Sequence, residues 1–236
     1  MPMEGNGPPQ LTQRGRGGWW FQDWFPRRVV AAVTDRSITA AELVQSLDFR
    51  VRVVEADQVH GSSIAMMHGS GTIRKPVAGC DALVTAVPGV ALLIRTADCV
   101  PIFISDPLRS IIGIAHAGWR GLAAWMPARL VAALRHNYQC QPRQLRAAIG
   151  PAIRSCCYEV GAEFAPRFGT FVKEQRGRRT CDLIGVAVDQ LRRSGMVPER
   201  ILDSHHCTAC ESQQWFSVRR EGEATSRLTS IIVIRP

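Results

Sequence analysis

The chain has 236 residues, 46% of them hydrophobic, and a formal net charge of +9. This length and composition suffice for one packed domain, or at most two small ones. No apolar run approaches the roughly 20 residues of a membrane span, and the N-terminus lacks the apolar core of a signal peptide, so we expect a cytoplasmic protein with no membrane partner. The basic residues are spread in short groups rather than along one helix face, which argues against nucleic acid as a partner. The net positive charge fits a small anionic substrate such as phosphate as well. The eight cysteines follow no regular framework, so we expect reduced thiols.

Residues 1–18 are rich in Gly, Pro and Arg, and we expect a disordered tail there, followed by a single domain over 19–236. A helix is predicted over 37–49, capped by Ser37 or Thr39 with Glu42 in its first turn. Short β-branched runs predict strands over 27–35, 51–56, 62–67, 80–86, 90–94, 100–104 and 110–115.

The second half of the chain also contains both predicted helices and predicted strands. One long helix is predicted over 119–138, an amphipathic helix over 181–195 with Gly195 as its C-cap, and a basic loop over 175–179. Strands are predicted over 145–149 and 200–203, and a closing antiparallel pair over 213–222 and 226–235. The fold class is therefore α/β (α+β), with a mixed sheet in a single domain.

Three separated motifs carry the residues suited to metal chemistry: His60 in QVHG, Cys99 in ADC and His116 in HAGWRG. Two imidazoles and one thiolate suit Zn²⁺, and three protein ligands leave a fourth position open, as in catalytic sites. Cu²⁺ accepts the same donors. Each residue also has a structural interpretation, since strand-end histidines are commonly hydrogen-bonded and a cysteine between apolar runs is commonly a buried small hydrophobe.

The segment after His116 resembles an anion site, because a strand, a glycine turn at Gly118 and a helix start follow one another, with Arg120 beside them. Arg120 is the first candidate for binding phosphate. Trp119 is a candidate for stacking on a base, or else a core residue.

Three more polar residues lie next to the metal motifs. Asp98 precedes Cys99 and is interpreted as a proton shuttle, as a partner of a histidine, or as an ordinary turn carboxylate. Arg95 is expected either to face the pocket or to pair with Asp98. Gln58, two residues before His60, is a further candidate for substrate binding.

A second cluster, SHHCTAC, contains His205, His206, Cys207 and Cys210, with the Cys-x2-Cys spacing of zinc knuckles. No second ligand pair of comparable definition is evident, because the adjacent Cys156 and Cys157 have no ligand spacing of their own. A loop with packed thiols is therefore the simpler interpretation, with a second metal as its alternative.

Five motifs occur in a fixed order over residues 50–236: QVHG, CDALVT..PGVALLIRTADCVPI, IIGIAHAGWRG, IGPAI..CCYEVG and a late FSVRREG. This set resembles the family called multicopper polyphenol oxidase (laccase)-like, purine nucleoside phosphorylase of that type, or peptidoglycan editing factor. The resemblance implies an αββα-type sandwich with mixed sheets, related to the catalytic domain of cytotoxic necrotizing factor toxins. It also implies a zinc site at His60, Cys99 and His116, phosphorolysis of adenosine, inosine and methylthioadenosine, and adenosine deamination. Its partners are a purine nucleoside and phosphate, and its oligomeric state is left open between monomer and homodimer.

The chain departs from the family pattern in three places, which affects substrate identity more than metal binding. It lacks the usual TTR-GGVS stretch near the N-terminus and the Asn-Leu-Gly segment before the QVHG strand, so part of the pocket is either missing or supplied by a neighbouring chain. The late HRR pattern reads VRR, with Val218 in place of the histidine.

Other functions were weighed against the phosphorylase. A four-copper oxidase needs more histidine ligands than the six in this chain, which argues against copper-dependent polyphenol oxidase activity. A cysteine hydrolase with Cys99 as nucleophile and His116 as base, trimming an amide in peptidoglycan precursors, is one alternative. A nucleoside-binding protein without turnover is the other.

Overall fold

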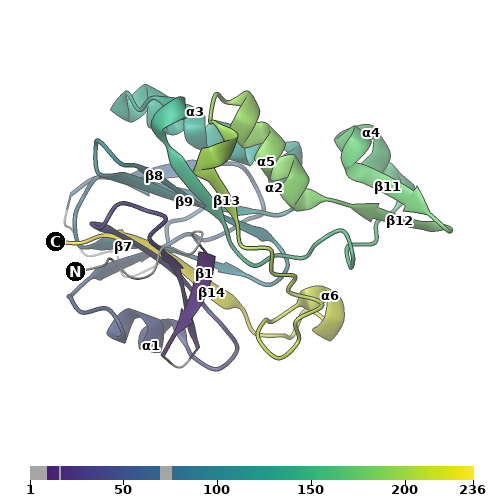
Figure 1. The fold of residues 1–236 in the computed structure, drawn as a ribbon, viewed down its shortest axis with the longest axis horizontal. Helices are drawn as coiled ribbons and strands as arrows, with labels where there is room; N and C mark the ends of the chain where they lie inside the picture. Colours follow the sequence, from purple (N-terminus) through teal and green to yellow (C-terminus); the bar gives the residue numbers. More distant parts are fainter. Residues whose placement is uncertain (1–9, 16, 70–75) are drawn as a thin grey trace, which may run out of the picture.

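Two six-stranded sheets lie face to face, and helices cover both outer faces (Figure 1). The structure is a computed structural model and describes residues 10–15, 17–69 and 76–236. Within these residues, no helix is long and apolar enough to cross a membrane. The two mixed sheets agree with the predicted α+β class.

The first sheet has the strand order β1-β2-β3-β14-β7-β4. Neighbouring strands are antiparallel except β4 and β7, which are parallel. The C-terminal strand β14 is central, and its alternation of buried β-branched residues contacts both faces of the sheet. Its strands are β1 (Gln10–Arg14), β2 (Gly18–Gln22), β3 (Val29–Thr34), β4 (Arg52–Glu55), β7 (Val90–Thr96) and β14 (Leu228–Ile234).

The second sheet has the order β13-β10-β8-β9-β6-β5 and is parallel only at its two edges. Its centre is the hairpin of β8 and β9, whose fourteen strand residues are all buried. Its strands are β5 (Ile64–Met67), β6 (Ala82–Thr85), β8 (Val100–Asp106), β9 (Ile111–Ala117), β10 (Arg146–Ile149) and β13 (Ile201–Asp203). A separate hairpin joins β11 (Val172–Gln175) and β12 (Arg178–Cys181).

The core is divided by the sheets, because successive side chains of a strand point to opposite faces. Phe103 and Ile114 of the second sheet pack between the sheets against Leu92 and Ile232 of the first. The outer face of the first sheet is covered by α1 through Leu43. The outer face of the second sheet packs against α3 and α5. The helices are α1 (Ala40–Gln45), α2 (Trp119–Ala123), α3 (Met126–Tyr138), α4 (Ala165–Phe168), α5 (Leu183–Arg193) and α6 (Val218–Glu221), with 3-10 turns at η1 (Pro142–Gln144), η2 (Ala162–Phe164), η3 (Gly169–Phe171) and η4 (Pro198–Arg200).

Local helix signals were predictive. Thr39 caps α1 and forms a capping box with Glu42, as expected. Asp182 caps α5 by accepting a hydrogen bond from the Gly185 backbone N–H, and Gly195 has the positive φ of 95° expected after a helix end.

The single helix predicted over 119–138 is wrong, since two helices, α2 and α3, occupy this segment. Trp125 adopts the left-handed region with φ of 62°, which breaks the helical path. Pro127 lies in the first turn of α3, where its missing N–H costs no hydrogen bond.

The predicted closing strand pair is also wrong. Residues 213–222 form a loop and the short helix α6, while β14 pairs with β3 and β7 instead. The prediction of a disordered tail over 1–18 is wrong for β1, because β1 forms a hairpin with β2. Residues 1–9 and 16 lie outside the described residues. The basic loop at 175–179 is the turn of the β11–β12 hairpin together with parts of both strands.

Candidate active site

His60, Cys99 and His116 come from three segments and meet at one point. His60 lies in the loop after β4, Cys99 lies directly before β8, and His116 lies on β9. Their ligand atoms all lie within 4.8 Å of one another, and the two imidazole rings meet edge to face with centroids 4.8 Å apart. Gly118 makes room for them, because a Cβ there would lie 3.0 Å from the Cys99 sulfur. Three separate segments thus bring together residues that are 17 to 56 positions apart in the sequence.

Asp81 organises this cluster and was not predicted from the sequence. Its carboxylate contacts His116 Nδ1 at 2.8 Å and accepts the backbone N–H groups of His60 at 2.9 Å and Gly61 at 2.7 Å. These bonds hold His60 in a left-handed conformation with φ of 59°. Asp81 engages Nδ1 of His116, so Nε2 remains for the centre of the cluster. The available signal was an acidic residue at the start of an apolar strand, CDALVT.

The cluster has coupled titrations. Burial alone would raise the pKa of the Cys99 thiol, but hydrogen bonds and charge from His116 and His60 outweigh it and lower the pKa to about 7. Burial alone would lower the pKa of His116, yet Asp81 and Cys99 raise it to about 9. In the absence of a metal, the two shifts favour an ion pair between a Cys99 thiolate and a His116 imidazolium.

The donor set fits a metal ion on chemical grounds. Two imidazole nitrogens and a sulfur converge, and an imidazole whose other nitrogen contacts a carboxylate is the usual arrangement of a histidine ligand. These donors suit both Zn²⁺ and Cu²⁺.

A cavity of about 820 Å³ opens beside this cluster. Its lining includes the eight residues predicted to bind the first metal, phosphate or substrate: Gln58, His60, Arg95, Asp98, Cys99, His116, Trp119 and Arg120. The volume is in the range of small-molecule binding sites. Sequence reasoning therefore identified one contiguous region of the molecule.

Asp98 lies in the cavity wall, but its carboxylate is engaged elsewhere than expected. One oxygen accepts the hydroxyl of Thr208 at 2.6 Å, and the other accepts the backbone N–H of Arg219 at 2.7 Å. The carboxylate partner of His116 is instead Asp81. Asp98 thus fixes the position of Arg219.

Arg95 pairs with Glu55 rather than with Asp98. Gln58 holds the backbone of Arg95 in both directions, donating to its carbonyl at 2.6 Å and accepting its N–H at 2.7 Å. These contacts fix the rim of the cavity next to His60.

Trp119 both contacts the core and lines the cavity. Its ring packs against Phe164 with centroids 5.5 Å apart, and it also lines the cavity. The Arg120 guanidinium lies over the ring at 4.5 Å from its centroid.

Several cavity residues were not singled out from the sequence, among them Tyr158, Arg219 and Arg227. The Arg219 guanidinium lies 5.0 Å from the Tyr158 ring centroid and donates to the Glu159 carbonyl at 2.9 Å. The VRR motif was the available signal for Arg219. Because this motif lies far from the metal motifs in the sequence, the sequence did not indicate that Arg219 lies near them in the fold.

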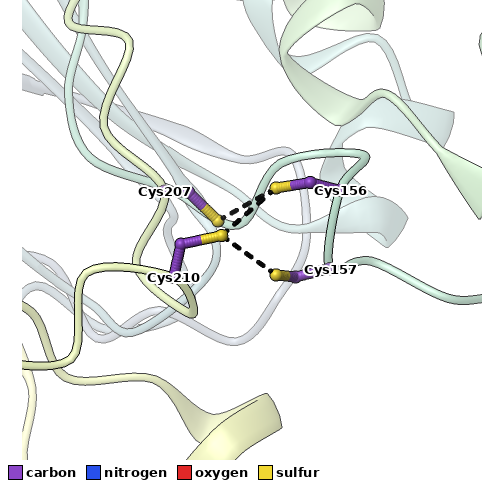
Figure 2. Close-up of side chains that lie close together, drawn as sticks. All are labelled: Cys156, Cys157, Cys207 and Cys210. Carbon is purple, nitrogen blue, oxygen red and sulfur yellow. Dashed lines mark hydrogen bonds between the residues drawn. The ribbon is translucent and has the colours of Figure 1, made fainter.

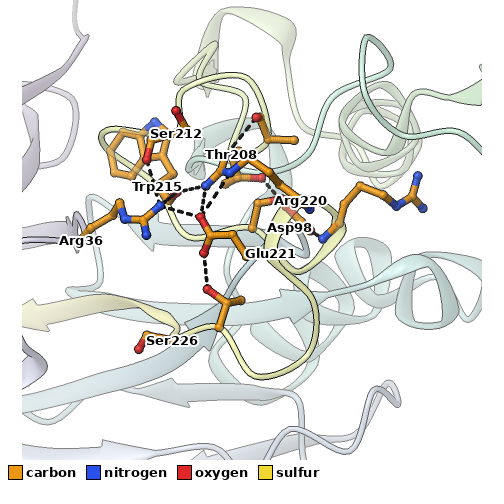
Figure 3. A network of polar contacts seen from close by, with 12 residues as sticks. Arg36, Asp98, Thr208, Ser212, Trp215, Arg220, Glu221 and Ser226 are labelled. Atoms are coloured by element: carbon orange, nitrogen blue, oxygen red, sulfur yellow. Dashed lines mark hydrogen bonds and ion pairs between the residues drawn. The ribbon is translucent and has the colours of Figure 1, made fainter.

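Figure 3 shows how the segment that carries Arg219 is held. Glu221 forms ion pairs with Arg36 from the loop after β3 and with Arg220. Arg220 donates to the carbonyls of Thr208 at 2.7 Å and Trp215 at 2.7 Å. The network ties α6, whose Val218 and Arg219 line the cavity, to the loop after β13.

A two-sheet α+β fold with a His–Cys–His cluster beside a cavity defines a class of candidate metalloproteins. Within it, the chain belongs to the multi-copper polyphenol oxidoreductase laccase family, whose model matches residues 32–235. The resemblance seen in the motifs is therefore confirmed.

Two relatives and one solved structure are similar to this chain over most of its length. A purine nucleoside phosphorylase of Deinococcus radiodurans is 35% identical over 181 residues, covering 75% of this chain and 68% of that protein. The crystal structure of YlmD from Geobacillus stearothermophilus matches with a TM-score of 0.88 and 28% identity, covering 97% of this chain and 100% of that chain. Adenosine deaminase RL5, from an unknown prokaryotic organism, is 33% identical over 158 residues, covering 63% of this chain and 60% of that protein.

Proposed function

We propose that this protein is a zinc-dependent purine nucleoside phosphorylase that acts on adenosine, inosine and methylthioadenosine and also deaminates adenosine. The observation that carries the proposal is the convergence of His60, Cys99 and His116 beside a cavity lined by arginines. Relatives named purine nucleoside phosphorylase and adenosine deaminase support the choice of substrate.

His60, Cys99 and His116 are the residues that would hold the metal. Zn²⁺ bound there supplies a Lewis acid next to the substrate, and Cu²⁺ is an alternative occupant of the same donors. Asp81 keeps His116 in the tautomer that presents Nε2 to the site.

The chain's own residues hold the two substrates. In phosphorolysis, a phosphate oxygen forms a bond to the anomeric carbon while the glycosidic C–N bond breaks, and its electron pair leaves with the purine, which takes up a proton. Arg120, Arg219 and Arg227 line the cavity and supply the positive charge that binds phosphate. Trp119 offers a face for the purine.

Around these groups, two residues act by positioning. Asp98 fixes the backbone of Arg219, while Gln58 fixes that of Arg95. Deamination is a separate reaction at the base: a water oxygen forms a bond to the purine carbon that carries the amino group, the bond to that amino group breaks, and the group leaves as ammonia with a proton from the water.

The deciding experiment is chromatography of adenosine incubated with the purified protein, with and without phosphate. We expect adenine and ribose 1-phosphate with phosphate, and inosine without it. His60→Ala and His116→Ala should abolish both reactions and remove the metal bound by this cluster, whereas His136→Ala, on the exposed face of α3, should change neither. Full metal content in both active-site variants would overturn the ligand assignment, and binding of adenosine without products would indicate a nucleoside-binding protein.

Arg120→Ala tests the phosphate site. Loss of one charged hydrogen-bond donor should raise the KM for phosphate about 10-fold or more, since such bonds contribute about 1.5–3 kcal/mol. Deamination without phosphate should fall less. Arg135→Ala, an exposed arginine of α3, is the matched control. Equal loss of both reactions would assign Arg120 to holding Trp119 in place instead.

The contact between Cys99 and His116 favours one second candidate, a cysteine hydrolase that cleaves an amide in peptidoglycan precursors. A thiolate next to an imidazolium is the arrangement that such enzymes use. Release of an amine from a muropeptide by metal-free protein, together with inactivity on nucleosides, would establish it.

A further inference from the structure

Four cysteines from two loops form a second cluster of candidate metal ligands, distinct from the His60 cluster. Cys156 and Cys157 lie in the loop after β10, while Cys207 and Cys210 lie in the loop after β13 (Figure 2). The Cys156 sulfur lies 3.6 Å from that of Cys207 and 3.4 Å from that of Cys210, and the Cys157 sulfur lies 3.3 Å from that of Cys210. All four sulfurs lie within 4.8 Å of one another.

The parallel edge of the second sheet causes this meeting. Strands β10 and β13 pair in parallel, so the segments that follow them leave the sheet at the same end. Ala152 and Cys207 continue the parallel pairing, with Thr208 donating its N–H to the Ala152 carbonyl at 3.1 Å. The two cysteine pairs are about 50 residues apart in sequence and yet face each other.

The sulfur geometry matches one central ion. A tetrahedral ion with Zn–S bonds of about 2.3 Å separates its sulfurs by about 3.8 Å, close to the contacts found here. A disulfide would need sulfurs about 2.05 Å apart, and all four cysteines are free thiols. Iron–sulfur clusters bind their cysteines through separate irons, which places the sulfurs farther apart than around a single ion.

We propose that Cys156, Cys157, Cys207 and Cys210 bind one Zn²⁺ as a structural tetrathiolate site. Four protein ligands fill a tetrahedral ion and leave no open position, in contrast to the three donors of the His60 cluster. Soft thiolates select zinc over hard cations. The Cys-x2-Cys motif noted in the sequence supplies half of the site, and the adjacent Cys156 and Cys157 supply the other half.

The site would fix one wall of the cavity. Tyr158 follows Cys157 directly and lines the cavity. Thr208 lies between the other two ligands and donates to Asp98. The Arg219 guanidinium donates to the carbonyls of Cys157 and Glu159. Metal bound to the four cysteines therefore restrains three groups that face the cavity, without itself facing the substrate.

The experiment uses a variant that lacks the first cluster, His60→Ala with His116→Ala, purified under reducing conditions. We expect about one zinc per chain by elemental analysis and an all-sulfur shell at about 2.3 Å by X-ray absorption spectroscopy. Adding Cys207→Ser and Cys210→Ser should lower zinc to near zero. Adding Cys140→Ala instead, a buried cysteine of the main core, should leave it unchanged.

Chelation supplies a readout that does not depend on the folding of a cysteine variant. Removing zinc from the double histidine variant should increase hydrogen exchange in the loops around residues 154–159 and 205–211. A double histidine variant without zinc would overturn the proposal, as would zinc with nitrogen or oxygen ligands. Intact-mass evidence for two disulfides among the four cysteines would establish a redox pair instead. Catalytic activity is not read, so failure of this site and failure of the proposed function are separable.

Discussion

At the residue scale, Asp81 decides how His116 can act. A histidine at a strand end presents either ring nitrogen, and the tautomer depends on the hydrogen bond made by the other one. Asp81 is fully buried and contacts Nδ1 of His116, while its remaining acceptors hold the loop of His60. One carboxylate thereby orients two of the three candidate ligands.

The Asp81→Asn variant tests this role. The amide cannot accept both backbone N–H groups and the imidazole proton, so His60 and His116 should lose their relative orientation. We expect metal affinity to fall about 10- to 100-fold, as for other carboxylates behind histidine ligands, measured by competition with a chelating dye. Asp189→Asn, on the surface of α5, is the control. Unchanged affinity would show that backbone geometry alone positions the histidines.

Cys99 is expected to react according to its metal. With the metal bound, its thiolate is neutralised by the cation and should alkylate slowly with iodoacetamide. After chelation, its pKa of about 7 should make it react faster than Cys140 and Cys181, whose burial raises the pKa to about 12 in each case. Peptide mass mapping measures the rates. If Cys99 is the fastest-labelled thiol before chelation, the cysteine hydrolase replaces the zinc enzyme as the better hypothesis.

At the scale of elements, α6 is positioned by charge rather than by a large apolar face. It has four residues, none of them fully buried, and its place depends on Glu221 with Arg36 and Arg220. A hydrogen bond from Thr225, together with the two arginines, lowers the pKa of Glu221 to about 2.

The Glu221→Gln variant should therefore be less stable than the wild type at pH 7. A carboxylate with a lowered pKa stabilises the fold above the ordinary value of 4.5, and this contribution is lost as the pH falls towards 2. The stability difference between wild type and variant should shrink between pH 5 and pH 3. Urea unfolding at each pH measures it. A difference that stays constant over this range would mean that the network acts through packing and not through charge.

At the scale of the whole molecule, the two sheets share one core and should unfold together. Phe103 of the second sheet is fully buried between the sheets, with its ring centroid 5.0 Å from that of Phe21 in the first. Trp24 also joins the sheets through a hydrogen bond to the Ala147 carbonyl at 2.9 Å.

Phe103→Ala should lower the free energy of unfolding by about 3–5 kcal/mol, the usual cost of such a cavity. Tryptophan fluorescence and circular dichroism should still report one coincident transition in urea, because the facing sides of the two sheets form one common core. Leu108→Ala, whose side chain is 69% exposed, should change stability little. Two separate transitions would contradict a shared core.

The sequence by itself determined what depends on neighbouring residues. The strands from β7 to β9 follow from short apolar runs, and the start of α1 follows from Thr39 and Glu42, because hydrophobic period and capping act over a few residues. The ordered motifs also identified the family and the residues around one cavity.

Only the tertiary structure decided which distant segments touch. Strand β14 enters between β3 and β7, the Asp81 carboxylate reaches His116, and Cys156 meets Cys207 across the parallel pair of β10 and β13. Each of these contacts joins segments that are 35 or more residues apart, and side-chain periodicity within a strand does not specify its partner. The partner of a strand is decided by which pairing buries the apolar surface of the whole chain, and that is a property of the packed fold.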